Sequence, residues 1–256
     1  MHIVTKIKEK EYRDSTGLSQ SMLKHFSVSP AHYLAETETK SEPTKAMILG
    51  TAFHANMLDD EPSDIYAVKR KVDGRSKEGR LYNEEFALEN AGKIIIDSDE
   101  HSRIISMSDS VMGHSFAGDL MQKLTHKEFA VYGDFNGVRL KGKIDGYIEQ
   151  DGIIIDLKTA EDASPKGFKK AIFDCQYNLQ VAHYTWLMLN AGKPVNYFYF
   201  IAVEKQAPYA VGVYKMSPIS VMQSMSTWEN LIDRFKICQE TGNYPAYSDN
   251  PVEITL

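Results

Sequence analysis

The stretch from Gly142 to Thr159, GKIDGYIEQDGIIIDLKT, sets two aspartates and a lysine among isoleucines. Apolar residues recur on both sides of an Asp151-Gly152 turn, which is typical of two strands joined in a hairpin. Successive side chains of a strand point to opposite faces, so Asp156 and Lys158 project in the same direction, about 7 Å apart. The stretch therefore predicts a β-hairpin that carries charged side chains into an otherwise apolar sheet.

The position of Asp145 depends on the register of this hairpin. A four-residue connection, 149–152, places Asp145 opposite Asp156, whereas a two-residue connection places it opposite Lys158. Both registers put the three charged groups on one face of the sheet. Because unpaired charges are costly on a half-buried sheet, the three groups either form a salt-bridged cluster or hold a divalent cation.

The three side chains also suggest a chemistry. Two carboxylates and a backbone carbonyl form an all-oxygen site suited to Mg²⁺ or Mn²⁺. A lysine beside them can orient or deprotonate a water molecule and offset the charge of a phosphorane-like transition state. The pattern indicates phosphodiester hydrolysis, with an ordinary Asp–Lys–Asp cluster at a strand end as the alternative.

The composition excludes several classes of protein. The chain has 256 residues, 43% of them hydrophobic, and a net charge of −6, so any DNA contact must be local. No apolar run has the length of a membrane span, and the first residues lack the apolar centre of a signal peptide, so we expect a cytoplasmic protein without membrane contacts. The two cysteines have no Cys or His neighbour at metal-ligand spacing, so we expect no disulfide, zinc or iron–sulfur site.

The order of predicted elements favours a single α/β domain, residues 1–256. Helical patterns fill about 15–125, strands and a helix fill about 126–215, and a last helix covers about 217–241. No internal repeat or long linker interrupts this order. We therefore expect a central mixed β-sheet flanked by α-helices.

Two further segments carry candidate site residues. In YNLQVAHYTWLMLNAGK and the residue before it, Gln176, Gln180 and Tyr184 recur every four residues, so they form one polar stripe on a predicted helix. This stripe is either one wall of the cleft that holds the carboxylates or the solvent face of the helix. The segment KRKVDGRSKEGR, 69–80, concentrates basic side chains and is either a solvated loop or a local DNA contact.

These motifs resemble a known family. GKIDGYI, IIDLKT and QYNLQVAHY look like the PD-(D/E)xK nuclease superfamily in its RecB-like branch, whose signatures are Gly-x-x-Asp, Asp-x-Lys and Gln-x-x-x-Tyr. The resemblance is narrower still to phage and prophage exonucleases of the exodeoxyribonuclease VIII (RecE) type, and it extends over 18–247. The segments that carry this narrower resemblance are GTAFHANMLD, GRSKEGR, the stretch from Leu157 to Tyr184, and FIAVEKQAPYAVGVY.

The resemblance implies roles for individual residues. Asp145, Asp156 and the Leu157 carbonyl would bind Mg²⁺, for which Mn²⁺ can substitute, and Lys158 would be the catalytic lysine. His54, in Gly-x-x-x-His, would reach the same metal.

Further roles follow from the same resemblance. Gln180 and Tyr184 match the Gln-x-x-x-Tyr motif, and Gln176 would face the same cleft one turn earlier. Glu128 corresponds to an acidic residue that some of these nucleases carry upstream of the hairpin, with a surface glutamate as the alternative. Basic residues of the 69–80 segment would contact DNA phosphates, namely Arg70, Arg75, Lys77 and Arg80.

The chain departs from some relatives in the superfamily. Two cysteines cannot supply the four ligands of the iron–sulfur cluster found in several RecB-like nucleases, so no such cluster is expected. A phosphate-binding Gly-x-x-x-x-Gly-Lys-[Ser/Thr] motif is missing from the sequence, so it does not indicate a helicase. The expectation is a free-standing nuclease.

By resemblance, this nuclease would digest double-stranded DNA from its 5′ ends in a bacterial cell and leave 3′ single strands for a partner annealing recombinase. The resemblance to this group implies oligomeric rings or toroids that enclose DNA. We therefore expect a homo-oligomer whose basic residues line the channel. Two alternatives remain: a structure- or sequence-specific endonuclease of the same fold, and a DNA-binding module without catalysis.

Overall fold

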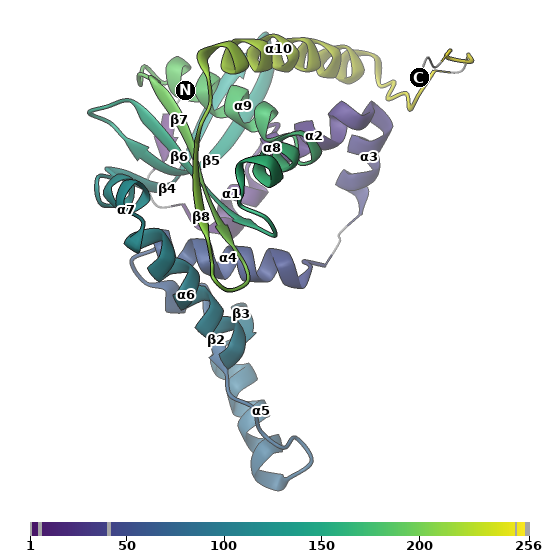
Figure 1. Cartoon of the computed structure of the whole chain (residues 1–256). Coiled ribbons are helices and arrows are strands. Elements are labelled where there is room, and N and C mark those ends of the chain that lie inside the picture. The colour runs from purple at the N-terminus through teal and green to yellow at the C-terminus, as the bar shows by residue number, and fades with distance from the viewer. Residues whose placement is uncertain (1, 5–6, 40–41, 249, 254–256) are drawn as a thin grey trace.

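The computed structural model describes residues 2–4, 7–39, 42–248 and 250–253. Within this part of the chain, the main sheet has six strands in the spatial order β1-β4-β5-β6-β7-β8 (Figure 1). Neighbouring strands are antiparallel except β6 and β7, which run parallel, so the expected mixed sheet is confirmed. Its strands are β1 (His2–Val4), β4 (His126–Phe135), β5 (Val138–Ile148), β6 (Ile153–Ala160), β7 (Tyr197–Glu204) and β8 (Val211–Lys215).

Helices cover both faces of the sheet. Alternate side chains of β6 enter two separate cores: Ile154 packs with α9 and α10, whereas Ile155 and Leu157 pack with α4 and α6. The parallel pair β6 and β7 is joined by a crossover through α8 and α9, as parallel strands require. The helices are α1 (Glu9–Asp14), α2 (Gln20–Val28), α3 (Pro30–Glu38), α4 (Lys45–Leu58), α5 (Lys77–Glu89), α6 (Ser98–Gly113), α7 (Ser115–Gln122), α8 (Pro165–Asp174), α9 (Tyr177–Asn190) and α10 (Pro218–Thr241), with a 3₁₀ turn at Pro62–Asp64.

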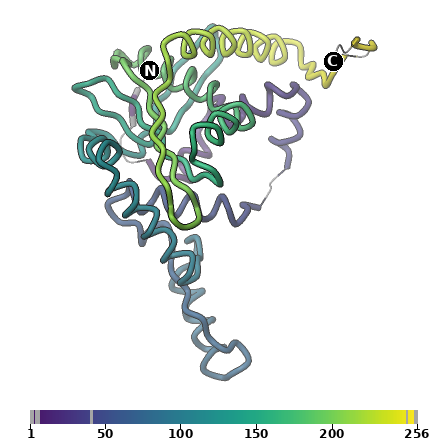
Figure 2. Tube along the Cα trace, in the orientation of Figure 1, coloured from purple at the N-terminus to yellow at the C-terminus, as the bar shows by residue number. Residues whose placement is uncertain are grey.

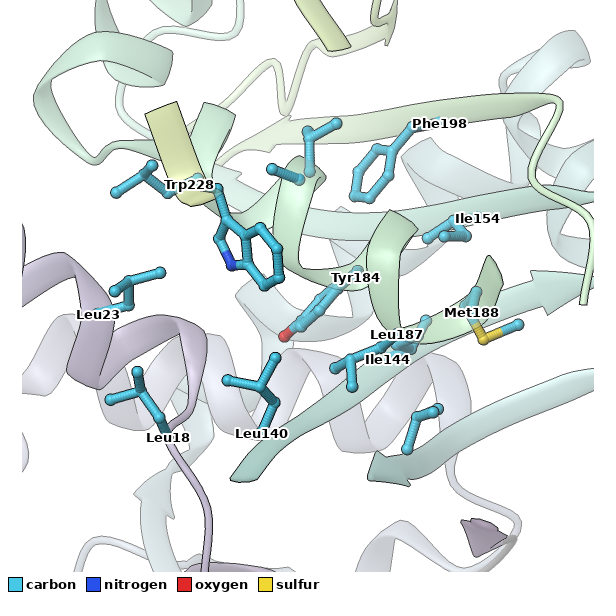
Figure 3. Packing of buried hydrophobic residues seen from close by; sticks show 14 of the residues in the cluster. Leu18, Leu23, Leu140, Ile144, Ile154, Tyr184, Leu187, Met188, Phe198 and Trp228 are labelled. Atoms are coloured by element: carbon cyan, nitrogen blue, oxygen red, sulfur yellow. The ribbon is translucent and has the colours of Figure 1, made fainter. Parts of the chain in front are cut away.

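The core beneath α9 and α10 contains a buried chain of hydrogen bonds that begins at Trp228, which Figure 3 shows among the apolar side chains. Trp228 and His183 are fully buried, and the indole Nε1 of Trp228 donates a 3.0 Å hydrogen bond to Nδ1 of His183. Because the indole can only donate, Nδ1 of His183 accepts, and Nε2 donates to the Lys141 carbonyl at 2.9 Å. This chain ties α10 to α9 and α9 to β5.

A narrow projection, the arm (residues 66–97), extends from the body of the molecule (Figure 2). It consists of β2 (Tyr66–Lys69), α5 and β3 (Ile94–Asp97), and its two strands pair in parallel. Figure 1 shows α5 at the end of the molecule opposite α10. The basic segment 69–80 therefore lies in the arm.

Most elements expected from the sequence are present, with local corrections. Ser19 caps α2, and α3 begins at Pro30 directly after a break at Ser29. Within the helical part expected at about 15–125, His114 separates α6 from α7, and Asp97 caps α6. No helix in the described ranges has both the length and the apolar character of a membrane span.

Candidate functional site

The site lies where β5 and β6 separate. The strands pair from Ile148 and Ile153 as far as Gly146 and Ile155, which confirms the four-residue connection. Past that pair, the Leu157 N–H donates a 2.8 Å hydrogen bond to Oδ2 of Asp145 instead of a strand carbonyl. A carboxylate therefore occupies the opening between the strands.

Three elements bring a histidine and two carboxylates together at this opening. His54 comes from α4, Glu128 from β4 and Asp145 from β5, and one ligand atom of each lies within 4.8 Å of the others. Nδ1 of His54 is 3.6 Å from Oδ2 of Asp145 and 3.9 Å from Oε1 of Glu128. Glu128 has a φ of 46°, a conformation that is rare for a non-glycine strand residue and often found at functional sites.

Asp156 lies beside this cluster with different partners. Its carboxylate is 1% exposed, contacts the Lys158 ammonium through Oδ1, and accepts a hydrogen bond from the Gln180 amide through Oδ2. The expectation that the three charged groups share one face is thus met by Asp156 and Lys158, whereas Asp145 turns into the strand opening toward α4.

The donor set fits a divalent cation. Carboxylate oxygens are the ligands that Mg²⁺ and Mn²⁺ prefer, and the imidazole of His54 adds a nitrogen donor of the kind that transition metals accept. His54, Glu128 and Asp145 have the mutual spacing of ligands, and Asp156 borders them from the next strand.

The electrostatic environment shifts the pKa values of the two aspartates in opposite directions. Burial raises the pKa of Asp156 to about 6, since the loss of solvent and the charge of Asp145 outweigh the attraction of Lys158. Burial also acts to raise the pKa of Asp145, but the charge and hydrogen bond of His54, with Lys158 and the Leu157 N–H, hold it below its usual value. Burial alone would lower the pKa of His54, yet Asp145 and Glu128 raise it to about 10. A cation bound at Nδ1 would have to displace that proton.

A second lysine, missed at the sequence level, completes the cluster. Lys143 pairs with Oε2 of Glu128, and its ammonium is also 3.2 Å from Oε2 of Glu9 on α1. Glu128 thus turns one oxygen toward Lys143 and the other toward His54. The signal was the alternation of β5, because Lys143 precedes Asp145 by two residues.

The predicted polar stripe of α9 is present only in part. Gln180 reaches Asp156, but Gln176 precedes the helix in a left-handed conformation with φ of 54°, so it does not continue the stripe. Its side chain accepts a hydrogen bond from Ser27 on α2 instead. Tyr177, which the sequence analysis overlooked, takes the place beside the site: its ring centroid is 4.7 Å from Nζ of Lys158.

Tyr184 lies mainly within the apolar core rather than in an open cleft (Figure 3). It is 8% exposed, and its ring packs close to Gly142 of β5. Burial raises the pKa of Tyr184 well above its usual value, so its hydroxyl keeps its proton at neutral pH. Gly142 leaves room for this ring, since a Cβ there would lie 3.1 Å from the nearest ring carbon.

The four predicted DNA-contact residues are not brought to the carboxylates. All four are exposed in the arm: Arg70, Arg75, Lys77 and Arg80. Arg70 stacks on Tyr82, with 4.2 Å between Cζ and the ring centroid. A role for these residues requires a ligand long enough to reach both regions.

The comparison with known families identifies the class. Residues 19–252 match the family described as a PDDEXK-like domain of unknown function (DUF3799). The chain belongs to this family, and its mixed sheet with flanking helices is the fold of PD-(D/E)xK nucleases.

Solved structures with similar folds were also found. A protein named "putative exonuclease" from Eubacterium rectale superposes with a TM-score of 0.64 at 13% identity, over 98% of this chain and 96% of that one. A phage-related exonuclease from Haemophilus somnus 129PT gives a TM-score of 0.33 at 11% identity, over 74% of this chain and 94% of that one. No curated protein matches the sequence. The Eubacterium rectale structure supports the fold and no more than the fold.

Proposed function

We propose that the protein is a divalent-metal-dependent double-stranded-DNA exonuclease. The observation that carries this proposal is the juxtaposition of His54, Glu128 and Asp145, with ligand atoms within 4.8 Å, beside the buried pair of Asp156 and Lys158. A purely structural ion-pair cluster would not need the left-handed backbone conformation of Glu128. Membership of a PDDEXK-like family agrees with this chemistry.

His54, Glu128, Asp145 and Asp156 are the side chains that would hold the cation, with the Leu157 carbonyl as a further ligand. When bound, Mg²⁺ or Mn²⁺ polarises a phosphodiester and lowers the pKa of a water molecule. The reaction joins the water oxygen to phosphorus and breaks one phosphorus–oxygen ester bond, and the proton lost by the water ends on the leaving oxygen.

The residues around the cation would position the other reactants. The Lys158 ammonium lies against the Tyr177 ring and Asp156, which restrict it to the cleft side of β6. From there it can orient the attacking water and offset charge that develops on phosphate oxygens. Gln180 fixes Oδ2 of Asp156, so that Oδ1 stays directed toward Lys158 and the opening.

The finer assignment rests on the resemblance to RecE-type exonucleases. It comprises digestion from the 5′ end, a 3′ single-stranded product for an annealing recombinase, a ring-shaped homo-oligomer and a phage or prophage origin. Each of these is part of the proposal. A nuclease acting on linear ends would be found with DNA in the bacterial cytoplasm.

The test uses the purified chain with Mg²⁺ or Mn²⁺ and two substrates, a linear duplex labelled at one 5′ end and a covalently closed circle. We expect loss of the linear DNA alone, early release of the label, and no cleavage by Lys158→Ala. Lys123→Ala, which removes an exposed lysine paired with Asp119 on α7, is the matched control.

Other outcomes would replace the proposal. Cutting of the circle would make the protein an endonuclease of the same fold. Lack of cleavage with either metal, together with DNA binding, would make it a non-catalytic binding module.

A further inference from the structure

A hollow of about 470 Å³ lies at the base of the arm, outside the candidate metal site. It is an open hollow, bordered by the N-terminal part of α4, by β2 and β3, and by residues of α5 and α6. In Figure 1, α4 lies between the sheet and the arm, and α4 contacts both β3 of the arm and β5 and β6 of the sheet. The volume is in the range of small-ligand sites, and a lone phosphate would leave most of it unfilled.

The rim of the hollow is basic. Lys45, Lys69, Arg70 and Lys71 line it, against the carboxylates of Asp97 and Glu100. Those two carboxylates are engaged by backbone N–H groups, because Asp97 caps α6 and Oε2 of Glu100 accepts from the Asp97 N–H at 2.9 Å.

The basic side chains themselves have few acidic partners. Lys71 pairs with Asp99 at 2.8 Å, whereas Lys45, Lys69 and Arg70 form no ion pair with any described residue. Arg70 is instead held against the Tyr82 ring, which leaves the edge of its guanidinium available to an anion. The rim therefore presents a small excess of positive charge, four basic side chains against Asp97, Asp99 and Glu100, on a chain whose net charge is −6.

The wall of the hollow is apolar and contains one amide. Ile48 of α4 and Ile95 of β3 line it, and Ile95 keeps 41% of its surface exposed. Asn83 of α5 also lines it, and its side-chain oxygen is buried without a hydrogen-bond partner among the described residues. An unsatisfied buried acceptor of this kind suits a ligand that brings an N–H donor.

From these features we infer that the hollow binds a nucleotide unit, with its phosphate at the basic rim and its base against the isoleucines beside Asn83. The charge matches a phosphate, the apolar wall matches the face of a base, and the free amide oxygen matches an exocyclic amine. This unit is either part of a DNA strand or a free mononucleotide. The first source rests on the proposed function; the second does not.

The position relative to the metal site is consistent with a DNA strand. Lys45 and His54 are nine residues apart on α4, which corresponds to about 14 Å along the helix axis and to opposite sides of the helix. A nucleotide in the hollow is therefore not the one that is cut. With about 3.4 Å per nucleotide along a duplex, this axial distance corresponds to about four nucleotides.

The test is a calorimetric titration of the full chain in a chelating buffer, so that neither metal nor cleavage is needed. The probes are a deoxynucleoside monophosphate, the matching deoxynucleoside, inorganic phosphate and a short single-stranded oligonucleotide. We expect the monophosphate to bind more tightly than the deoxynucleoside or phosphate. The double variant Lys45→Ala/Lys69→Ala should bind it about tenfold more weakly, as expected for lost charged contacts.

Two further variants define the site. Asn83→Ala should weaken binding of the monophosphate but not of inorganic phosphate. Lys236→Ala, an exposed lysine on α10 at the other end of the molecule, should change nothing.

The titrations distinguish a DNA strand from a free nucleotide, and they include results that would contradict the inference. If the double variant weakens the oligonucleotide as much as the monophosphate, the unit belongs to DNA; if it weakens the monophosphate alone, the ligand is a free nucleotide. Phosphate binding as tight as nucleotide binding, or unchanged binding by the double variant, would overturn the inference. The cleavage assay with metal tests the proposed function separately.

Discussion

The candidate metal site and the hollow of the arm both gather charged side chains, but they do so in opposite environments. At the metal site, Asp156 is 1% exposed and each charged group contacts another. At the hollow, the lysines and the arginine are exposed to solvent or nearly so, and most lack acidic partners. Buried charges must be compensated within the fold, whereas exposed charges cost little and depend on a ligand.

The strongest test of this contrast removes a buried charge. Asp145→Asn should reduce cleavage on the order of a thousandfold, because it removes a cation ligand and the partner of His54 in one step. Rates with Mg²⁺ and Mn²⁺ provide the measurement. Asp174→Asn, which affects an exposed carboxylate paired with Lys170, is the control. Equal rates for Asp145→Asn and the parent protein would remove Asp145 from the site.

A second test concerns a buried group that is neutral rather than paired. Burial lowers the pKa of His183 to about 4, although its hydrogen bond to the Lys141 carbonyl opposes this shift. The unfolded chain takes up the proton near pH 6.5 and the folded chain does not, so stability is complete above that pH and falls as the pH drops toward 4. The loss attributable to His183 should be about 3 kcal/mol at most.

The measurement is the free energy of unfolding in denaturant at pH 7 and pH 4.5 for the parent protein and His183→Phe. Carboxylates elsewhere contribute equally to both proteins, so the difference isolates His183. The parent should lose more stability than the variant on acidification. Identical losses would show that His183 is not held neutral.

A third test addresses the residue that positions Glu128. Lys143→Met removes the partner of one Glu128 oxygen, so Mn²⁺ affinity should fall roughly tenfold, the scale of lost outer contacts at metal sites. Lys143→Arg should restore most of it, since it retains the charge. Titration of Mn²⁺ by calorimetry gives the answer, and tighter binding by Lys143→Met would mean that the lysine competes with the cation instead.

The smallest effect is expected in the exposed arm. Charge reversal of Arg75 and Lys77 should weaken DNA binding several-fold and lower the slope of log K against log salt by about 2 if each contacts one phosphate. The cleavage rate at saturating DNA should stay unchanged. Unchanged binding across a salt titration would exclude a DNA contact by these residues.

Several parts of the fold could be predicted because they depend on local pattern. The hairpin of β5 and β6 follows from alternation and the Asp151-Gly152 turn, and the start of α2 follows from Ser19, a residue type that caps helices. The short strands β1 and β2 were not predicted, because three or four residues carry too little periodicity. α8 was also missed, although Ser164 and Pro165 at its start are a recognisable helix beginning.

The candidate site likewise contains residues whose positions the local pattern predicted and residues whose positions it did not. Asp156, Lys158 and Gln180 lie together as their spacing predicted, whereas Gln176 leaves its expected face because the chain there adopts a left-handed turn to enter α9. Alternation along β5 relates Lys143 to Asp145, but the contact of Lys143 with Glu128 comes from the pairing of β4 with β5. The place of Tyr177 beside Lys158 comes from the α8–α9 corner.

The sequence by itself determined the charged hairpin, the mixed α/β architecture and the motifs of a PD-(D/E)xK family. These depend on side-chain alternation and helical spacing, which act over a few residues. The tertiary structure decided that Glu128 joins His54 and Asp145, that Asp156 turns to Lys158 and Gln180, and that a basic hollow forms at the base of the arm. Such contacts join residues far apart in the chain, so they arise only when the packing of strands and helices brings them together.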